Sequence, residues 1–122
     1  MDKPEVDFPD FPVPDTLRTD DLVEGTGAEA TPGSTAVVHY VGVAYSTGEE
    51  FDASWNRGAP FQFPVGAGRV IAGWDQGVAG MRVGGRRRLV VPPHLGYGDR
   101  GAGSAIGPGE TLIFVVDLLD VR

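Results

Sequence analysis

The sequence contains no cysteine and only two histidines, His39 and His94. Without cysteine it can form neither a disulfide framework nor a thiolate zinc site. Two histidines are too few for a histidine metal cluster, and we expect no metal and no cofactor. No run of about 18 apolar residues is present, which argues against a membrane partner. The acidic start of the chain also lacks the apolar segment of a secretory signal, so we expect a cytoplasmic protein.

The chain also lacks an excess of positive charge, since its net charge is −7. Residues 1–30 hold nine acidic and two basic residues, whereas residues 31–122 hold eight of each. Because phosphate binding needs a basic surface, this distribution argues against nucleic acid as a partner. The one basic cluster is Arg86-Arg87-Arg88. If it lies on a strand its side chains alternate between faces, which predicts a solvated sheet edge.

The first 16 residues are poorly suited to regular structure. They contain four prolines among acidic residues, a pattern that forbids a helix and disfavours a paired strand. We therefore predict an extended leader over residues 1–16 and a folded domain over residues 17–122. The leader is expected to be a solvated arm, with partial docking through Phe8 and Phe11 as the alternative.

Hydrophobic periodicity predicts one short helix over about residues 71–80. Its apolar stripe consists of Ile71, Trp74, Val78 and Met81. Three glycines interrupt the segment, namely Gly73, Gly77 and Gly80. Each glycine costs about 1 kcal/mol relative to alanine in a helix interior, so the surrounding structure must hold this helix. We hypothesise that the glycines let the strands approach closely.

The other apolar segments alternate with period two, which predicts strands. They cover residues 17–24, 35–45, 50–54, 61–65, 86–91 and 111–121. Five or six antiparallel strands with one short helix make an α+β domain. Between the last two strands lie residues 92–110, and a loop of that length usually has a function.

The common catalytic constellations are missing. No serine lies in a Gly-x-Ser-x-Gly elbow, two histidines do not complete a convincing triad, and no glycine-rich loop suits a phosphate. What remains is a set of aromatic residues on different elements: Tyr40, Phe51, Phe61, Phe63, Trp74, Tyr97 and Phe114. They either fill the core or converge on an apolar pocket for a small ligand.

A series of motifs decides between these readings, because their order and spacing match a known family. The motifs are Val38-His39-Tyr40-Val41-Gly42, Gly48 with Phe51-Asp52-Ala53-Ser54, Pro60-Phe61-Gln62-Phe63, the run from Val70 to Val78, Met81-Arg82-Val83-Gly84, Tyr97-Gly98 and Thr111-Leu112-Ile113-Phe114. Together they resemble the FK506-binding proteins, which are immunophilin peptidyl-prolyl isomerases, in a small bacterial-like single-domain form. The resemblance covers about residues 17–122.

The resemblance implies a half-barrel sheet wrapped around the short helix, with a pocket between them. Carried over position by position, it implies the catalytic residues Tyr40, Phe51, Asp52, Trp74, Tyr97 and Phe114. It also implies the substrate-binding residues Arg57, Phe61, Val70, Ile71 and Ile106. Trp74 would form the floor, and the Ile71 N–H and the Tyr97 hydroxyl would donate to a substrate carbonyl. Asp52 would lie beside Tyr40 and Arg57.

The implied reaction is rotation about X-Pro peptide bonds, whose barrier is about 18–20 kcal/mol. No covalent bond breaks, so neither a nucleophile nor a metal is needed. The twisted transition state has lost amide resonance, and its carbonyl carries less negative charge than the planar amide. A dry apolar pocket therefore favours the transition state over the ground state.

The resemblance thus implies a monomeric peptidyl-prolyl cis/trans isomerase that acts on X-Pro-containing polypeptides, assists protein folding and binds FK506- or rapamycin-type macrolides. One alternative is a binding module that holds a proline-containing partner. Another is a chaperone-like folding helper, although such relatives usually carry an added domain. The leader could also insert Phe11-Pro12 or Val13-Pro14 into this pocket or a neighbour's. At Ile106-Gly107-Pro108 many relatives have Ile-Pro-Pro, so Gly107 should loosen this loop and alter drug affinity.

Overall fold

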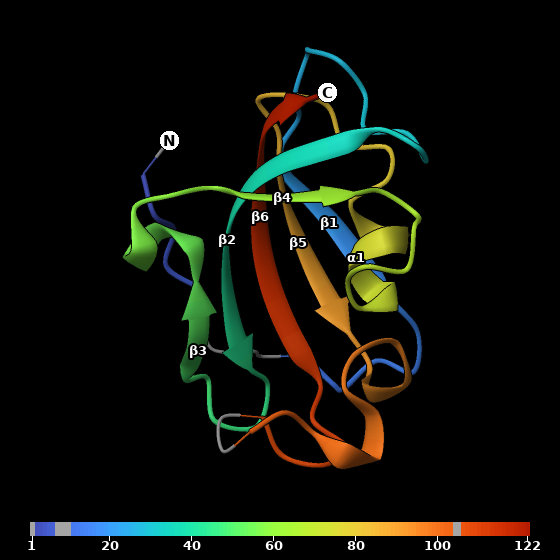
Figure 1. The fold of residues 1–122 in the computed structure, drawn as a ribbon. Coiled ribbons are helices and arrows are strands. Elements are labelled where there is room, and N and C mark those ends of the chain that lie inside the picture. Colours follow the sequence, from blue (N-terminus) through green and yellow to red (C-terminus); the bar gives the residue numbers. More distant parts are fainter. Residues whose placement is uncertain (1, 7–10, 104–105) are drawn as a thin grey trace.

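The computed structural model describes residues 2–6, 11–103 and 106–122. Its described strands form one antiparallel sheet: β1 (Arg18–Val23), β2 (Thr35–Ala44), β3 (Glu50–Ala53), β4 (Phe61–Pro64), β5 (Arg86–Val91) and β6 (Leu112–Val121). The strands are ordered β1-β5-β6-β2-β3, and β4 pairs with β2 as well. The helix α1 (Ala72–Gly77) packs on one side of this curved sheet (Figure 1). The predicted α+β architecture is confirmed.

The strands begin and end within one residue of their predicted bounds, whereas α1 is shorter than the predicted helix over 71–80. The chain leaves the helix at Val78, and Gly80 then takes a φ of +90°. This left-handed conformation suits glycine and ends the helical turn. Val78 and Met81 are still buried in the core, which explains why the apolar periodicity continues beyond the helix.

Two of the three glycines allow the helix to lie close against β5. A methyl group added at Gly73 would lie 2.5 Å from Val91 Cγ1, and one added at Gly77 would lie 2.9 Å from Leu89 Cδ2. Both distances are too short for carbon–carbon contact. The close-approach hypothesis is confirmed for this pair. It is wrong for Gly80, where an added methyl group meets no described residue within 4 Å and the positive φ is the reason for glycine.

One edge of β2 is shared by two short strands. β4 pairs with Thr35–Val38 and β3 pairs with Val41–Val43, and a 3-10 turn over Ser54–Arg57 follows β3. Tyr40 lies in the gap between the two partners. Its backbone N–H donates instead to the buried Ser54 Oγ over 2.7 Å. This bond satisfies a buried donor that would otherwise be orphaned, and it fixes Tyr40 at the centre of the strand.

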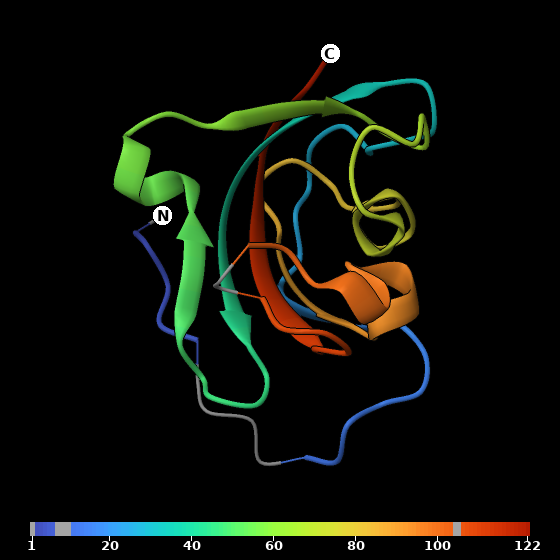
Figure 2. The same cartoon turned by 60° about the horizontal axis from the view of Figure 1, so that its bottom comes forward.

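The described part of the leader is docked through two apolar side chains. Val6 and Phe11 pack on the sheet face opposite α1, over a cluster made of Val41, Val43, Ala53, Val90 and Ile113. Figure 2 shows residues 2–6 and α1 on opposite sides of the sheet. The Tyr45 hydroxyl donates to the Phe11 carbonyl, and the Phe11 ring meets the Tyr45 ring edge-on at 5.8 Å. The solvated-arm prediction is therefore wrong for Phe11, and Phe8 lies outside the described residues.

The three consecutive arginines are not a solvated edge, because β5 is an interior strand between β1 and β6. Arg86 forms a bidentate pair with Asp117, whose side chain is 1% exposed. Arg87 pairs with Asp21 and also donates to the Gly77 carbonyl at the end of α1. Arg88 pairs with Asp20. The cluster was misread because its acidic partners lie more than 30 residues away along the chain.

Candidate active site

A pocket of about 220 Å³ lies between the concave sheet face and the beginning of α1. It is lined by Tyr40, Phe51, Asp52, Phe61, Arg69, Val70, Ile71, Trp74, Tyr97 and Phe114. Nine of the eleven predicted site residues are thus brought together. Arg57 lies outside the lining, bonded to two lining residues. Ile106 is buried in the core and does not line the pocket. Arg69 is an addition that the sequence reasoning missed.

Trp74 is only 4% exposed and its ring is surrounded by other aromatic rings. The ring centroids of Tyr40 and Phe114 lie 4.9 and 5.3 Å from that of Trp74, both in edge-to-face geometry. Phe61 completes the group at 6.0 Å. Such pairs are favourable beyond their buried area and hold the rings in fixed orientations. Within the described residues nothing accepts a hydrogen bond from Trp74 Nε1.

The far wall depends on a glycine in β2. The rings of Phe51 and Phe114 meet edge-to-face at 5.7 Å. A methyl group added at Gly42 would lie 2.6 Å from Phe51 Cζ and 2.8 Å from Phe114 Cε1. Gly42 therefore leaves the space in which the two rings approach each other. The sequence motif contained this glycine, but its role depends on strands that are distant in sequence.

A polar corner interrupts the aromatic lining. The Tyr40 hydroxyl donates to Asp52 Oδ2 over 2.5 Å, and Arg57 Nη1 donates to Asp52 Oδ1 over 2.7 Å. Arg57 Nη2 donates to the Tyr40 hydroxyl oxygen over 2.8 Å, which closes a triangle. All three residues were predicted from the resemblance to lie together, and they do.

The pKa values of the two acidic groups of this corner, Tyr40 and Asp52, are shifted in opposite directions. Burial, reinforced by the neighbouring Asp52 carboxylate, raises the pKa of Tyr40 above its ordinary value. Burial alone would raise the pKa of Asp52, but hydrogen bonds from Tyr40 and Arg57 outweigh it and hold that pKa below its ordinary value. At neutral pH the corner therefore holds a carboxylate, a guanidinium and a neutral phenol. These are the protonation states in which the three hydrogen bonds of the triangle form.

The pocket rim is a loop clamped onto α1. The backbone N–H groups of Gly66 and Gly68 donate to the Asp75 carboxylate over 2.9 and 3.0 Å. Ile71 then caps the helix, and in the described structure its own N–H has no acceptor. This is one of the unpaired donors of a helix start, and here it belongs to a pocket-lining residue. Asp75 was missed because its role depends on the folded shape of the loop.

Tyr97 borders the pocket from the long loop after β5, and its side chain is 41% exposed. The same loop contains an isolated bridge between Ala102 and Ile106. Residues 104–105 lie outside the described residues. The loop was expected to have a function because of its length, and the structure shows that Tyr97 connects it to the pocket.

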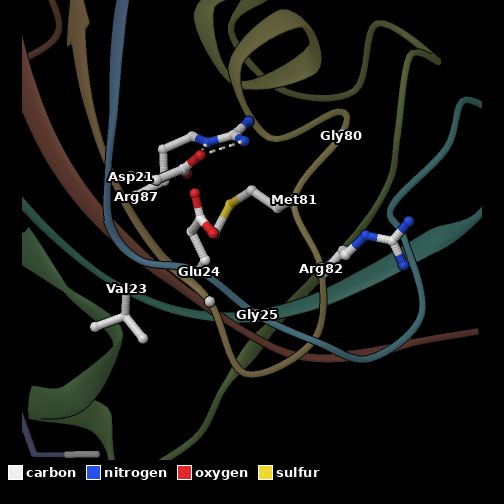
Figure 3. Close-up of a pocket in the computed structure, with 9 residues that line it drawn as sticks. Asp21, Val23, Glu24, Gly25, Gly80, Met81, Arg82 and Arg87 are labelled. Atoms are coloured by element: carbon white, nitrogen blue, oxygen red, sulfur yellow. Dashed lines mark hydrogen bonds and ion pairs between the residues drawn. The ribbon is translucent and has the colours of Figure 1, made fainter.

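A second pocket of about 280 Å³ lies where β1 meets the turn after α1 (Figure 3). Its lining residues are Asp21, Val23, Glu24, Gly25, Gly80, Met81, Arg82, Gly85 and Arg87. Figure 3 shows the ion pair of Asp21 with Arg87 on one wall and the Glu24 side chain beside it. Among the described residues that line this pocket there is no aromatic ring and none of the predicted site residues. We therefore assign the candidate active site to the aromatic pocket.

Two absences concern the described ranges. No three histidine or acidic side chains among them gather closely enough to hold a metal ion. None of the helices in that part of the chain is long and apolar enough to cross a membrane.

The sequence matches the family of FKBP-type peptidyl-prolyl cis-trans isomerases over residues 27–119. It is 66% identical to the FK506-binding protein of Streptomyces anulatus over 122 residues, which cover 99% of this chain and 98% of that protein. It is 49% identical to the peptidyl-prolyl cis-trans isomerase FPR2 of Saccharomyces cerevisiae over 100 residues, 82% of this chain and 74% of that protein.

The fold is also similar to that of a solved structure. The crystal structure of AtFKBP13 superposes with a TM-score of 0.80 at 41% sequence identity, covering 87% of this chain and 93% of that one. The sequence match, the fold and the aromatic pocket at the start of α1 point to one family. We conclude that the chain belongs to the FKBP-type peptidyl-prolyl cis-trans isomerases.

Proposed function

We propose that the aromatic pocket binds the proline ring of a polypeptide and accelerates rotation about the preceding X-Pro bond, with no covalent intermediate. The observation that carries this proposal is the basin of aromatic rings around the buried Trp74. A flat apolar floor with steep aromatic walls suits the pyrrolidine ring, which is compact and has no hydrogen to donate.

Catalysis in such a pocket comes from the change in amide polarity along the reaction. The planar amide has a strongly polarised carbonyl, and the twisted amide has lost that resonance. Transfer from water into an apolar pocket therefore costs the planar form more than the twisted form. Binding that favours the transition state in this way raises the rate without a catalytic acid or base.

The few polar groups at the site orient the substrate. In this proposal the Ile71 N–H, which has no acceptor among the described residues, and the Tyr97 hydroxyl donate to carbonyl oxygens of the bound chain. Asp52 and Arg57 balance each other's charge at one side of the pocket, and their bonds to the Tyr40 hydroxyl hold that ring in the lining.

The same pocket suits macrolides of the FK506 and rapamycin type, which offer an apolar ring system with carbonyl acceptors. Similarity to an FK506-binding protein of Streptomyces anulatus and to a probable FK506-binding protein of Corynebacterium glutamicum supports this part of the proposal. We also propose that the enzyme assists folding. Uncatalysed X-Pro isomerisation takes about tens to hundreds of seconds and limits the folding of many chains.

A protease-coupled assay on a short X-Pro peptide tests the proposal. Micromolar protein should raise the isomerisation rate, FK506 should suppress the increase, and Trp74→Ala should remove most of it while circular dichroism shows an intact fold. A folded wild-type protein that leaves the rate unchanged would refute the proposed activity. Peptide binding without any rate increase would instead favour the binding-module alternative.

A further inference from the structure

Arg69 is a charged pocket residue that the proposed reaction does not use. It lines the aromatic pocket, and among the described residues of that lining the only other charged one is Asp52. The Asp52 charge is already balanced by Arg57, whose Nη1 lies 2.7 Å from Asp52 Oδ1. Across the described ranges, Arg69 forms neither an ion pair nor a side-chain hydrogen bond. Its positive charge at the pocket is therefore uncompensated.

The backbone on both sides of Arg69 is anchored. On one side the Gly68 N–H donates to Asp75 Oδ2 over 3.0 Å, and Gly68 takes a φ of +73°. On the other side Val70 and Ile71 pack against the hydrophobic core. Arg69 itself is exposed. The fold thus holds its Cα at the pocket rim and leaves the guanidinium free to reach a bound peptide.

The other charges near the pocket do not cancel that of Arg69. Asp99 and Arg100 follow Tyr97 in the loop, carry opposite charges, and do not line the pocket. Asp75, the acidic residue that holds the rim loop, accepts hydrogen bonds from the Gly66 and Gly68 N–H groups and does not pair with Arg69. Within the described residues Arg69 is therefore an unpaired charge of the pocket lining, and such a charge selects among ligands by their charge.

We propose that Arg69 makes the enzyme prefer X-Pro bonds with an acidic residue close to the proline. This inference rests on the proposed function and names its preferred substrate class. A carboxylate on the bound peptide forms a charge-assisted hydrogen bond with the guanidinium, whereas a lysine at the same place is repelled. Because Arg69 is exposed, the preference is moderate and falls as salt is added.

The test compares three peptides with the same X-Pro bond and with Glu, Gln or Lys next to it. At low salt we expect kcat/KM for the Glu peptide to exceed that for the Lys peptide by about fivefold, the size expected of a single partly solvated ion pair. The ratio should fall towards one in Arg69→Gln and should invert in Arg69→Glu. Because ratios are taken within each variant, any change in overall activity cancels.

Arg100→Gln is the matched control, since it removes the same charge from an exposed arginine outside the pocket lining. It should keep the wild-type ratio. A preference that persists in Arg69→Gln, or that Arg100→Gln abolishes equally, would overturn the inference. So would a wild-type enzyme that turns over the Gln peptide without distinguishing Glu from Lys.

Failure of the proposed function gives a different result, because the Gln peptide would then show no rate increase at all. In that event the Kd values of the three peptides, measured by NMR shift titration, give the same ratio without turnover. Equal Kd values for the Glu and Lys peptides would then overturn the inference about Arg69.

Discussion

Three residues show how this pocket can contain charge without acid–base chemistry. Tyr40, Asp52 and Arg57 bond one another in a closed triangle. Each group stabilises the protonation state that the others have at neutral pH, since the pKa of Asp52 is lowered and that of Tyr40 is raised. Protonation therefore changes the triangle only at the extremes of pH.

The sign of the Asp52 shift fixes the direction of a pH prediction. A carboxyl whose pKa is lower in the folded than in the unfolded protein binds fewer protons when folded. The contribution of Asp52 to the free energy of unfolding is complete above the ordinary pKa of 3.8. It is lost as the pH falls through the lower pKa of the folded protein. The difference in unfolding free energy between wild type and Asp52→Asn should hence be constant from pH 7 to 5 and shrink below about pH 4. Urea unfolding at each pH measures it, and a difference that grows in acid would contradict the assignment.

Gly73 provides a second test at the residue scale. Gly73→Ala improves helix propensity by about 1 kcal/mol but puts a methyl group 2.5 Å from Val91 Cγ1. Overpacking costs about 1–3 kcal/mol, so we expect a net loss of stability in urea unfolding. Gly107→Ala is the control, because an added methyl group there meets no described residue within 4 Å. A Gly73→Ala protein that is more stable than wild type would show that helix and strand can separate easily.

At the scale of elements, the pocket exists because two short strands share one edge of β2. This arrangement places Asp52 at the end of β3 and Phe61 at the start of β4, on either side of Tyr40. The gap between them needs an acceptor for the Tyr40 N–H, and Ser54 supplies it. Ser54 Oγ also lies 2.8 Å from His39 Nδ1, so the serine ties the turn to β2 at two points.

Ser54→Ala should destabilise the protein and lower kcat/KM together. A buried N–H left without an acceptor costs about 1–3 kcal/mol, and Tyr40 loses the bond that fixes its backbone. Thermal unfolding and the peptide assay measure the two effects. Ser46→Ala, at an exposed serine bonded to Glu110, should stay within about 0.5 kcal/mol of wild type. Unchanged stability in Ser54→Ala would mean that water replaces the serine.

The elements were predictable to the extent that they depend on local pattern. The alternation of apolar residues predicted both ends of every strand to within one residue, because alternation reflects which face of a strand is buried. The helix end was placed too late, since buried Val78 and Met81 continue the pattern through a turn. At Val78 and Met81 the apolar periodicity indicates burial and not helical structure.

Interactions between distant segments could not be predicted from local pattern. The partners of Arg86, Arg87 and Arg88 lie on β1 and β6, and the clamp of Asp75 on Gly66 and Gly68 requires the folded loop. Nine of the residues that line the pocket were predicted through the resemblance to a family. The family's motifs indicate which residues of different elements lie together, and composition does not. Arg69 was missed because the resemblance supplied no role for that position.

At the scale of the whole molecule, the sheet has two differently covered faces. The concave face carries α1 and the pocket, and the opposite face carries a second apolar cluster. The leader covers part of that cluster and is tied down by Lys3, which pairs with Glu50 over 2.9 Å. No residue from the described part of the leader lines the aromatic pocket. Insertion of Phe11-Pro12 or Val13-Pro14 into the chain's own pocket is therefore not what the structure shows.

Removing the Phe11 side chain should weaken the fold without affecting the pocket. The ring contacts Tyr45 and lies 5.1 and 5.4 Å from the guanidinium carbons of Arg18 and Arg88. Because Phe11 is half-buried, Phe11→Ala should cost about 1–2 kcal/mol, less than a full core deletion. Urea unfolding and kcat/KM should separate the two effects. Val13→Ala, at a leader residue that is 53% exposed, is the control. Equal stability of both variants would contradict docking of the leader.

The most direct test of the central claim is two-dimensional NMR exchange spectroscopy on a short peptide with one X-Pro bond. Cis and trans signals of the peptide should show exchange cross-peaks on adding a catalytic amount of the protein, although the uncatalysed interconversion is too slow to give them. The account predicts that these cross-peaks vanish with folded Trp74→Ala and that cis and trans populations stay unchanged throughout. Absence of cross-peaks with the folded wild-type protein, or their full persistence with Trp74→Ala, would contradict it.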